Sequence, residues 1–175
     1  LMKRAVADTA ALHDTVSDII NEVRTHGDEA LRAFSLKFDK CSLTSLEVSP
    51  DEMREAENTV APELKSAIKA AAQNIAKFHK AQLMQPIEVE TAPGVLCSQR
   101  AVPISDVGLY IPGGNSPLFS TVLMLAVPAK IAGCRNIELC TPAGPDGKVN
   151  PAILYAAGVA GVSRIFKSGG AQAIA

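Results

Sequence analysis

The chain has 175 residues, of which 47% are hydrophobic, and its 17 basic side chains nearly balance its 18 acidic ones. This length predicts one domain or two small ones, and the balanced charge excludes the basic surface typical of nucleic-acid-binding proteins. No run of about eighteen apolar residues indicates a membrane span, and the charged first residues do not resemble a signal peptide. We therefore expect a cytoplasmic protein with neither a nucleic-acid nor a membrane partner.

The first part of the chain is predicted to be mainly helical. Ser49, followed by Pro50 and by Glu52 at the third helical position, has the pattern of a capping box. A short extended segment is predicted just before it, at residues 46–48. Helices are predicted at residues 9–25, 28–38, 50–60 and 62–83, and apolar side chains recur at helical spacing in the first and the last of them.

Neither the histidines nor the cysteines form a recognisable metal site. His13 and His26 stand among polar residues and are interpreted as solvated, and His79 has no His, Cys or Asp three or four positions away. The four cysteines contain no C-x-x-C pair, which disfavours a zinc site. A catalytic thiol at Cys97 or Cys134 is an alternative, although the sequence supplies no basic neighbour to form the thiolate.

The pattern becomes extended after the helices. Residues 87–90 and 95–102 are predicted to form a hairpin around Pro93-Gly94. The composition changes after Pro103, so we place a domain boundary near Ser105. This divides the chain into residues 1–104, helical with a short β segment, and residues 105–175.

The second part alternates strands and helices. Strands are predicted at residues 107–111, 136–141 and 164–167, and helices at residues 118–131, 151–161 and from 171 onward. This alternation is typical of an α/β fold with a parallel sheet and right-handed crossovers. Pro128 is expected to kink or split the first helix. The sheet is expected to leave an unpaired edge after Lys167, compensated by self-association, by strand exchange or by packing of the N-terminal helices over the exposed face.

Two Gly-Gly turns follow strands of this predicted sheet. Because the carboxyl ends of parallel strands share one edge, where open α/β folds bind ligands, we expect a nucleotide or phosphate site there. The first turn lacks both the G-x-G-x-x-G spacing and the lysine of a P-loop, so a tight turn without a ligand is the alternative. The residues expected along this edge are Tyr110, Gly113, Gly114, Thr141, Gly169, Gly170 and Gln172.

Several segments resemble one enzyme family. VGLYIPGGNSPLFSTVLMLAVPAKIAGC closely resembles the central motif of the histidinol dehydrogenases, and SGGAQAIA resembles a second motif of that family. Upstream, DIINEVRTHGDEALRAFSLKFDK and APELKSAIKAAAQNIAKFHKAQ are similar to the family's N-terminal region. The resemblance covers nearly the whole chain.

The resemblance implies an oxidoreductase that converts L-histidinol through L-histidinal to L-histidine, at the end of histidine biosynthesis. It implies two hydride transfers to NAD, a bound zinc and an intertwined homodimer. It also implies two incomplete Rossmann-like domains, with residues 1–104 as the leading part of one and residues 105–175 as the first half of the other.

The resemblance also assigns residue roles. Tyr110 and Gln172 match family positions that contact NAD, and we add Gly113 and Gly114 from the turn argument above. The family's zinc ligands, general base and most substrate contacts lie beyond Ala175. We therefore expect a fragment that has no catalytic residue or zinc ligand and is inactive alone. A stand-alone module that binds a nucleotide or a partner is the alternative from another functional class.

Overall fold

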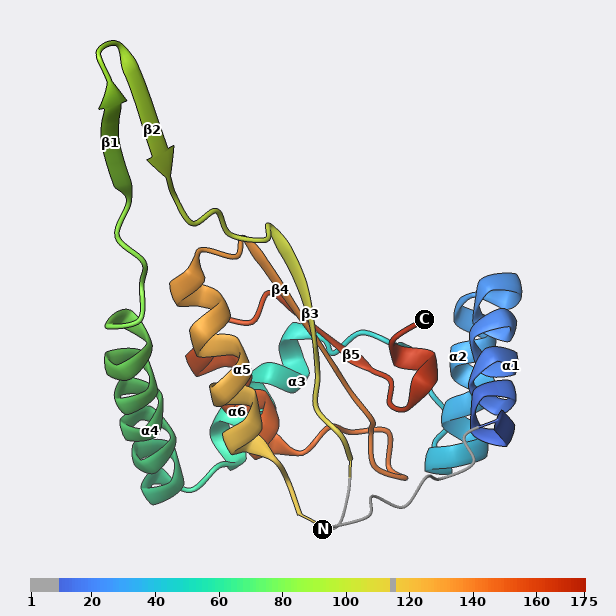
Figure 1. Ribbon diagram of the computed structural model, residues 1–175. Coiled ribbons are helices and arrows are strands. Elements are labelled where there is room, and N and C mark those ends of the chain that lie inside the picture. Colours follow the sequence, from blue (N-terminus) through green and yellow to red (C-terminus); the bar gives the residue numbers. More distant parts are fainter. Residues whose placement is uncertain (1–9, 114–115) are drawn as a thin grey trace, which may run out of the picture.

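A three-stranded parallel sheet lies at the centre of the structure, a computed structural model that describes residues 10–113 and 116–175 (Figure 1). Its strands are β3 (Asp106–Tyr110), β4 (Asn136–Thr141) and β5 (Arg164–Lys167), and β4 lies between the other two. Helices α5 (Phe119–Ala132) and α6 (Pro151–Ala160) connect successive strands. The predicted α/β fold with a parallel sheet is therefore confirmed.

The hydrophobic core lies between the sheet and these two helices. Along β4, Ile137, Leu139 and Thr141 are buried, whereas the alternating residues are more exposed, as expected for a strand with one face against helices. Asn150 caps α6, because its side-chain oxygen accepts a hydrogen bond from the Ala152 N–H at 2.9 Å. The strands and their crossover helices thus form two layers.

A third layer comes from the first part of the chain, which is mainly helical as predicted. Helices α3 (Pro50–Thr59) and α4 (Pro62–Lys80) pack against α6 and α5, so the order of layers is sheet, crossover helices, N-terminal helices (Figure 1). The capping box is confirmed: the Glu52 N–H donates to Ser49 Oγ at 3.2 Å, and the Ser49 N–H donates to the Glu52 carboxylate at 2.9 Å.

Two further helical segments lie apart from α3 and α4. Helix α1 (Ala10–His26) and helix α2 (Asp28–Phe34), which continues as the π-helical turn η1 (Ser35–Asp39), lie beside the carboxyl-terminal turn η2 (Ala171–Ala173) (Figure 1). The helix expected from residue 171 onward is only this single 3₁₀ turn. No helix in the described part of the chain is long and apolar enough to cross a membrane.

The predicted hairpin is confirmed, and it projects away from the rest of the molecule (Figure 1). Strand β1 (Ile87–Ala92) pairs with the antiparallel strand β2 (Val95–Gln99), and every residue of both strands is exposed. The second strand ends at Gln99, three residues earlier than predicted. The division of the chain near Ser105, just after this hairpin, stays a prediction.

The expectation of an unpaired edge after Lys167 is wrong. The Val48 N–H donates to the Ile165 carbonyl at 2.9 Å, and the Lys167 N–H donates to the Leu46 carbonyl at 2.7 Å. The short extended segment at residues 46–48 therefore runs antiparallel along the outer side of β5. It satisfies backbone groups that the edge strand would otherwise expose.

Pro128 does not split α5, which continues through it to Ala132. The proline removes the hydrogen bond to the carbonyl of Met124, four residues earlier.

Candidate functional site

A cavity of about 760 Å³, the main cavity below, lies at the carboxyl edge of the parallel sheet. One wall consists of the segments that follow the three strands, with Tyr110, Gly113, Thr141 and Gly169 among its residues. The opposite wall comes from α3 and the start of α6. Of the residues that the sequence places at this edge, the structure therefore brings together Tyr110, Gly113, Thr141, Gly169 and Gly170.

Pro142 packs between the two glycine turns. A Cβ atom on Gly113 would overlap the ring of Pro142, and a Cβ on Gly169 would lie 2.9 Å from Pro142 Cβ. Both glycines are therefore required by close packing, which accounts for them even without a ligand. Gly114, the other predicted residue of the first turn, lies outside the described residues.

Tyr110 and Gln172 meet at Gly170. The Gly170 N–H donates to the Tyr110 hydroxyl at 3.0 Å, and a Cβ on Gly170 would lie 2.6 Å from Gln172 Oε1. Gly170 also has a φ of +64°, which favours glycine. Gln172 is only 4% exposed and lines a second cavity of about 560 Å³, not the larger one. The two predicted residues are thus neighbours, but only Tyr110 lines the main cavity.

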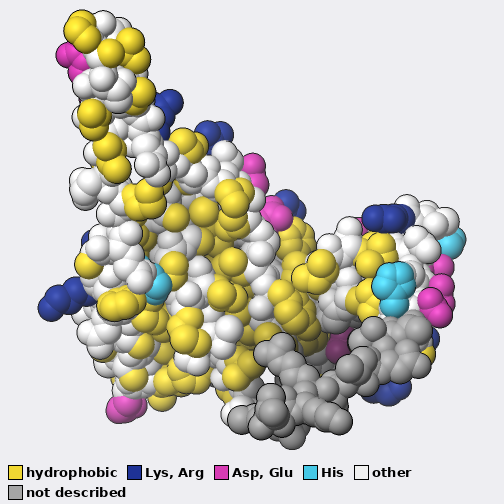
Figure 2. Space-filling model, viewed as in Figure 1, with side chains coloured by type: hydrophobic (Ala, Val, Ile, Leu, Met, Phe, Trp, Pro, Cys, Tyr) yellow, Lys and Arg dark blue, Asp and Glu magenta, His cyan; other side chains and the backbone are white. Residues whose placement is uncertain are grey.

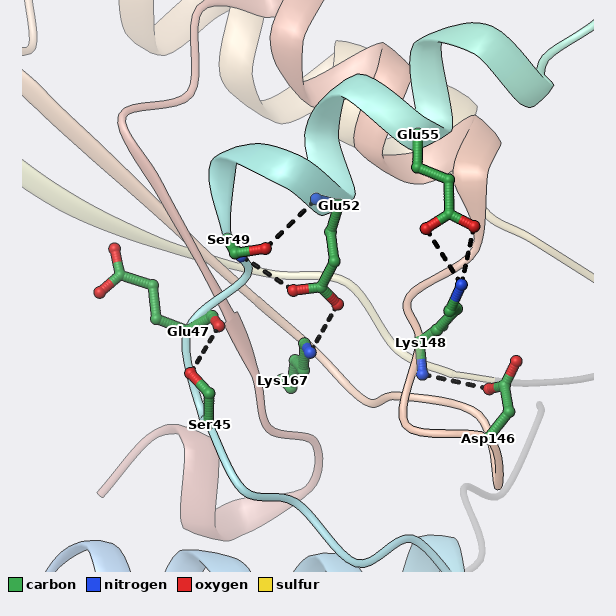
Figure 3. A network of polar contacts seen from close by, with 8 residues as sticks. All are labelled: Ser45, Glu47, Ser49, Glu52, Glu55, Asp146, Lys148 and Lys167. Carbon is green, nitrogen blue, oxygen red and sulfur yellow. Dashed lines mark hydrogen bonds and ion pairs between the residues drawn. The ribbon is translucent and has the colours of Figure 1, made fainter.

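A buried ion pair joins α3 to the end of β5 (Figure 3). Lys167 Nζ lies 2.6 Å from Glu52 Oε1, and the two side chains are 8% and 21% exposed. Burial alone raises the pKa of Glu52, but the hydrogen bonds from Lys167 and Ser49 outweigh it and hold that pKa below its ordinary value. Sequence analysis identified Glu52 only as a capping residue and missed Lys167, although a lysine ending a buried strand requires a partner.

A second ion pair joins α3 to the loop before α6. Lys148 Nζ lies 2.7 and 3.0 Å from the two carboxylate oxygens of Glu55, and the Lys148 N–H donates to Asp146 Oδ1 at 3.1 Å (Figure 3). The hydrogen bond to Glu55 raises the pKa of Lys148. Unlike the Glu52 pair, this one is exposed to solvent. The wall formed by α3 therefore carries carboxylates whose lysine partners are already engaged.

The other candidate residues lie away from this cavity. Cys97 is on the exposed β2 strand and Cys134 is in the hydrophobic core, so neither could act as a thiol in the main cavity. His13 and His26 are exposed on α1, and His79 is near the end of α4. Within residues 10–113 and 116–175, no three His, Cys, Asp or Glu side chains are grouped so as to hold a metal ion.

Known proteins match this chain along nearly its whole length. The family model for histidinol dehydrogenase matches residues 2–175. The chain is 58% identical over its full length to the histidinol dehydrogenase of Bacteroides fragilis and 52% identical to that of Salmonella typhimurium, and it spans 41% and 39% of those two proteins.

A solved structure agrees with these sequence matches. The crystal structure of histidinol dehydrogenase from Elizabethkingia anophelis superposes with a TM-score of 0.91 at 46% identity, over 99% of this chain and 39% of that one. The chain thus spans about two fifths of the length of the relatives it matches. With a family model that covers nearly every residue and a matching fold, this chain belongs to the histidinol dehydrogenase family.

Proposed function

We propose that this chain is part of a longer enzyme that oxidises L-histidinol through L-histidinal to L-histidine with NAD and zinc. Family membership supports the reaction. The observation that carries the role of this part is the cavity of about 760 Å³ at the carboxyl edge of the sheet, where open α/β folds bind ligands. Its size lies within the range of about 300–1,000 Å³ typical of small-molecule and cofactor sites.

The residues around this cavity fit a dinucleotide. When bound, NAD would supply the hydride acceptor for the oxidation. The Tyr110 hydroxyl accepts a hydrogen bond from Gly170, which fixes its position and leaves its own hydrogen free to donate to a ligand. Thr141, whose buried hydroxyl has no partner among the described residues, also lines this cavity. This part of the enzyme would therefore bind and orient the cofactor.

Gln172 would contribute through the same turn. Its amide oxygen packs beside Gly170, so it limits how the turn between β5 and η2 can move. We also propose that Gly113, which lines the cavity, contacts the cofactor through its backbone. We include the predicted Gly114 in the same role.

We propose that the zinc is held by residues of the complete enzyme that lie outside this chain. The described residues do not provide a suitable ligand group, so we assign no step of the reaction to zinc here. The general base is likewise assigned to another part of the enzyme, and this chain alone is expected to be inactive.

We also propose that the enzyme is a homodimer and works in the cytoplasm. The projecting hairpin exposes the apolar side chains of Ile87, Val89, Val95 and Leu96, and Figure 2 shows hydrophobic atoms along its length. Such side chains favour burial against another subunit. All four cysteines are free thiols, as is typical of proteins in a reducing compartment.

Calorimetric titration of the complete enzyme with NAD tests the cofactor role. Tyr110→Ala and Gln172→Ala should each weaken NAD binding about ten- to hundredfold, the cost of one lost contact in a partly buried site. L-histidinol binding without NAD and zinc content should stay unchanged, and Tyr110→Phe separates the hydroxyl from the ring. Unchanged NAD affinity in folded variants would remove both residues from the site, and NADH formation by this chain alone would contradict its expected inactivity.

A further inference from the structure

Thr141 combines two properties that no other described hydroxyl shares. It is the last residue of β4, it is 1% exposed, and its Oγ1 has no hydrogen-bond partner among the described residues. At the same time it lines the main cavity. A buried hydroxyl without a partner costs free energy relative to its hydrated state, so its presence here requires an explanation.

The neighbours of Thr141 within the protein do not supply this partner. Ile137 and Leu139, which precede it on the same face of β4, are apolar. Lys167 is its register partner on β5, and side chains at paired positions lie on the same face. The ammonium group of Lys167, however, is already bound to Glu52 at 2.6 Å. Thr141 also lines the main cavity, so we take the partner to approach from there.

The charges around the cavity limit the kind of group that could bind there. Of the opposite wall's side chains, Glu52 and Glu55 on α3 are both acidic, and Asp39 also lines the cavity. Lys148 and Lys167 are engaged in ion pairs with these carboxylates, so among the described residues this wall offers a phosphate no free lysine to bind. An uncharged polar group needs no such cation.

We propose that Thr141 is an NAD-binding residue whose hydroxyl forms a hydrogen bond with an uncharged polar group of the cofactor, a ribose hydroxyl or the carboxamide. This inference rests on the proposed function of the cavity. The proposed site then contains Thr141 on the central strand, between the two glycine turns, in addition to Tyr110 and those turns.

The test is NAD titration of the complete enzyme carrying Thr141→Val, Thr141→Ser or Thr141→Ala, together with thermal unfolding in the absence of NAD. Thr141→Val keeps the shape and removes the hydroxyl. It should weaken NAD binding about five- to thirtyfold, the equivalent of one buried hydrogen bond, without lowering the Tm. Thr141→Ser keeps the hydroxyl and should bind NAD nearly as well as the original protein.

Ser35 provides a matched control. Its hydroxyl is also buried without a partner in the described residues, but it does not line the cavity. Ser35→Ala should therefore leave NAD affinity unchanged. Thr141→Ala removes both the hydroxyl and the γ-methyl group, and it must weaken NAD binding as much as Thr141→Val does. This second variant keeps the test decisive if the valine variant does not fold.

The outcomes separate this inference from the function it rests on. If the original enzyme binds NAD and the hydroxyl-free variants bind it equally well, Thr141 is not a contact and only this inference fails. Equal weakening by Thr141→Ser and Thr141→Val would also overturn it, because the hydroxyl would then not be the cause. Failure of the original enzyme to bind NAD would overturn the proposed function itself.

Discussion

Replacing Lys167 with methionine should strongly destabilise the fold. Methionine has a similar length but no charge, so Lys167→Met leaves the Glu52 carboxylate without its main partner. Removing one member of a buried ion pair typically costs about 3–5 kcal/mol. Since Glu52 is 21% exposed and keeps the hydrogen bond from the Ser49 N–H, we expect a loss of about 2–4 kcal/mol here.

Urea unfolding of the chain, followed by circular dichroism at neutral pH, measures this loss. The double variant Glu52→Gln with Lys167→Met removes both charges and should recover about 1–3 kcal/mol relative to the sum of the single changes. Glu55→Gln is the matched control on the same helix. It breaks the exposed pair with Lys148 and should have a much smaller effect.

Two results would refute this reasoning. If Lys167→Met and Glu55→Gln destabilise the chain equally, the burial of the Glu52–Lys167 pair does not increase its contribution to the free energy of unfolding. If the single changes at Glu52 and Lys167 add without coupling, the two groups do not interact as the 2.6 Å contact requires.

Two further predictions concern the same region. Burial raises the pKa of Glu52, but the hydrogen bonds from Lys167 and Ser49 bring it below its unfolded value of 4.5. Ionised Glu52 therefore stabilises the folded chain above pH 4.5, and this contribution is lost as the pH falls through the folded pKa. Urea titrations from about pH 6 to about pH 3 should therefore show the stability gap between the original chain and Glu52→Gln narrowing, and a widening gap would contradict the assignment. Gly169→Ala should destabilise the chain by about 1–3 kcal/mol because its Cβ would press on Pro142, whereas Gly108→Ala, with no atom within 4 Å of the new Cβ, serves as the neutral control in the same assay.

Local patterns in the sequence predicted most of the elements of this fold. Ser49 and Glu52 are three residues apart, and their capping box depends only on the first turn of α3. The alternation of apolar strands and helices after Ser105 likewise specified a parallel sheet, because a crossover helix between strands leaves few other arrangements. Tyr110, Gly113 and Thr141 were placed at one edge by the same argument.

Long-range contacts were not predictable in this way. Nothing near residues 46–48 in the sequence indicates that they pair with β5, and nothing near Glu52 identifies Lys167 as its partner. These partners meet only when the layers pack. A charged or hydrogen-bonding group that becomes buried loses its water and must then pair with a complementary group nearby. The sequence by itself therefore determined the elements, the resemblance to the family and the edge of the sheet at which the main cavity lies. Only the tertiary structure decided which side chains are already satisfied within the protein, and thus that the Thr141 hydroxyl is not among them.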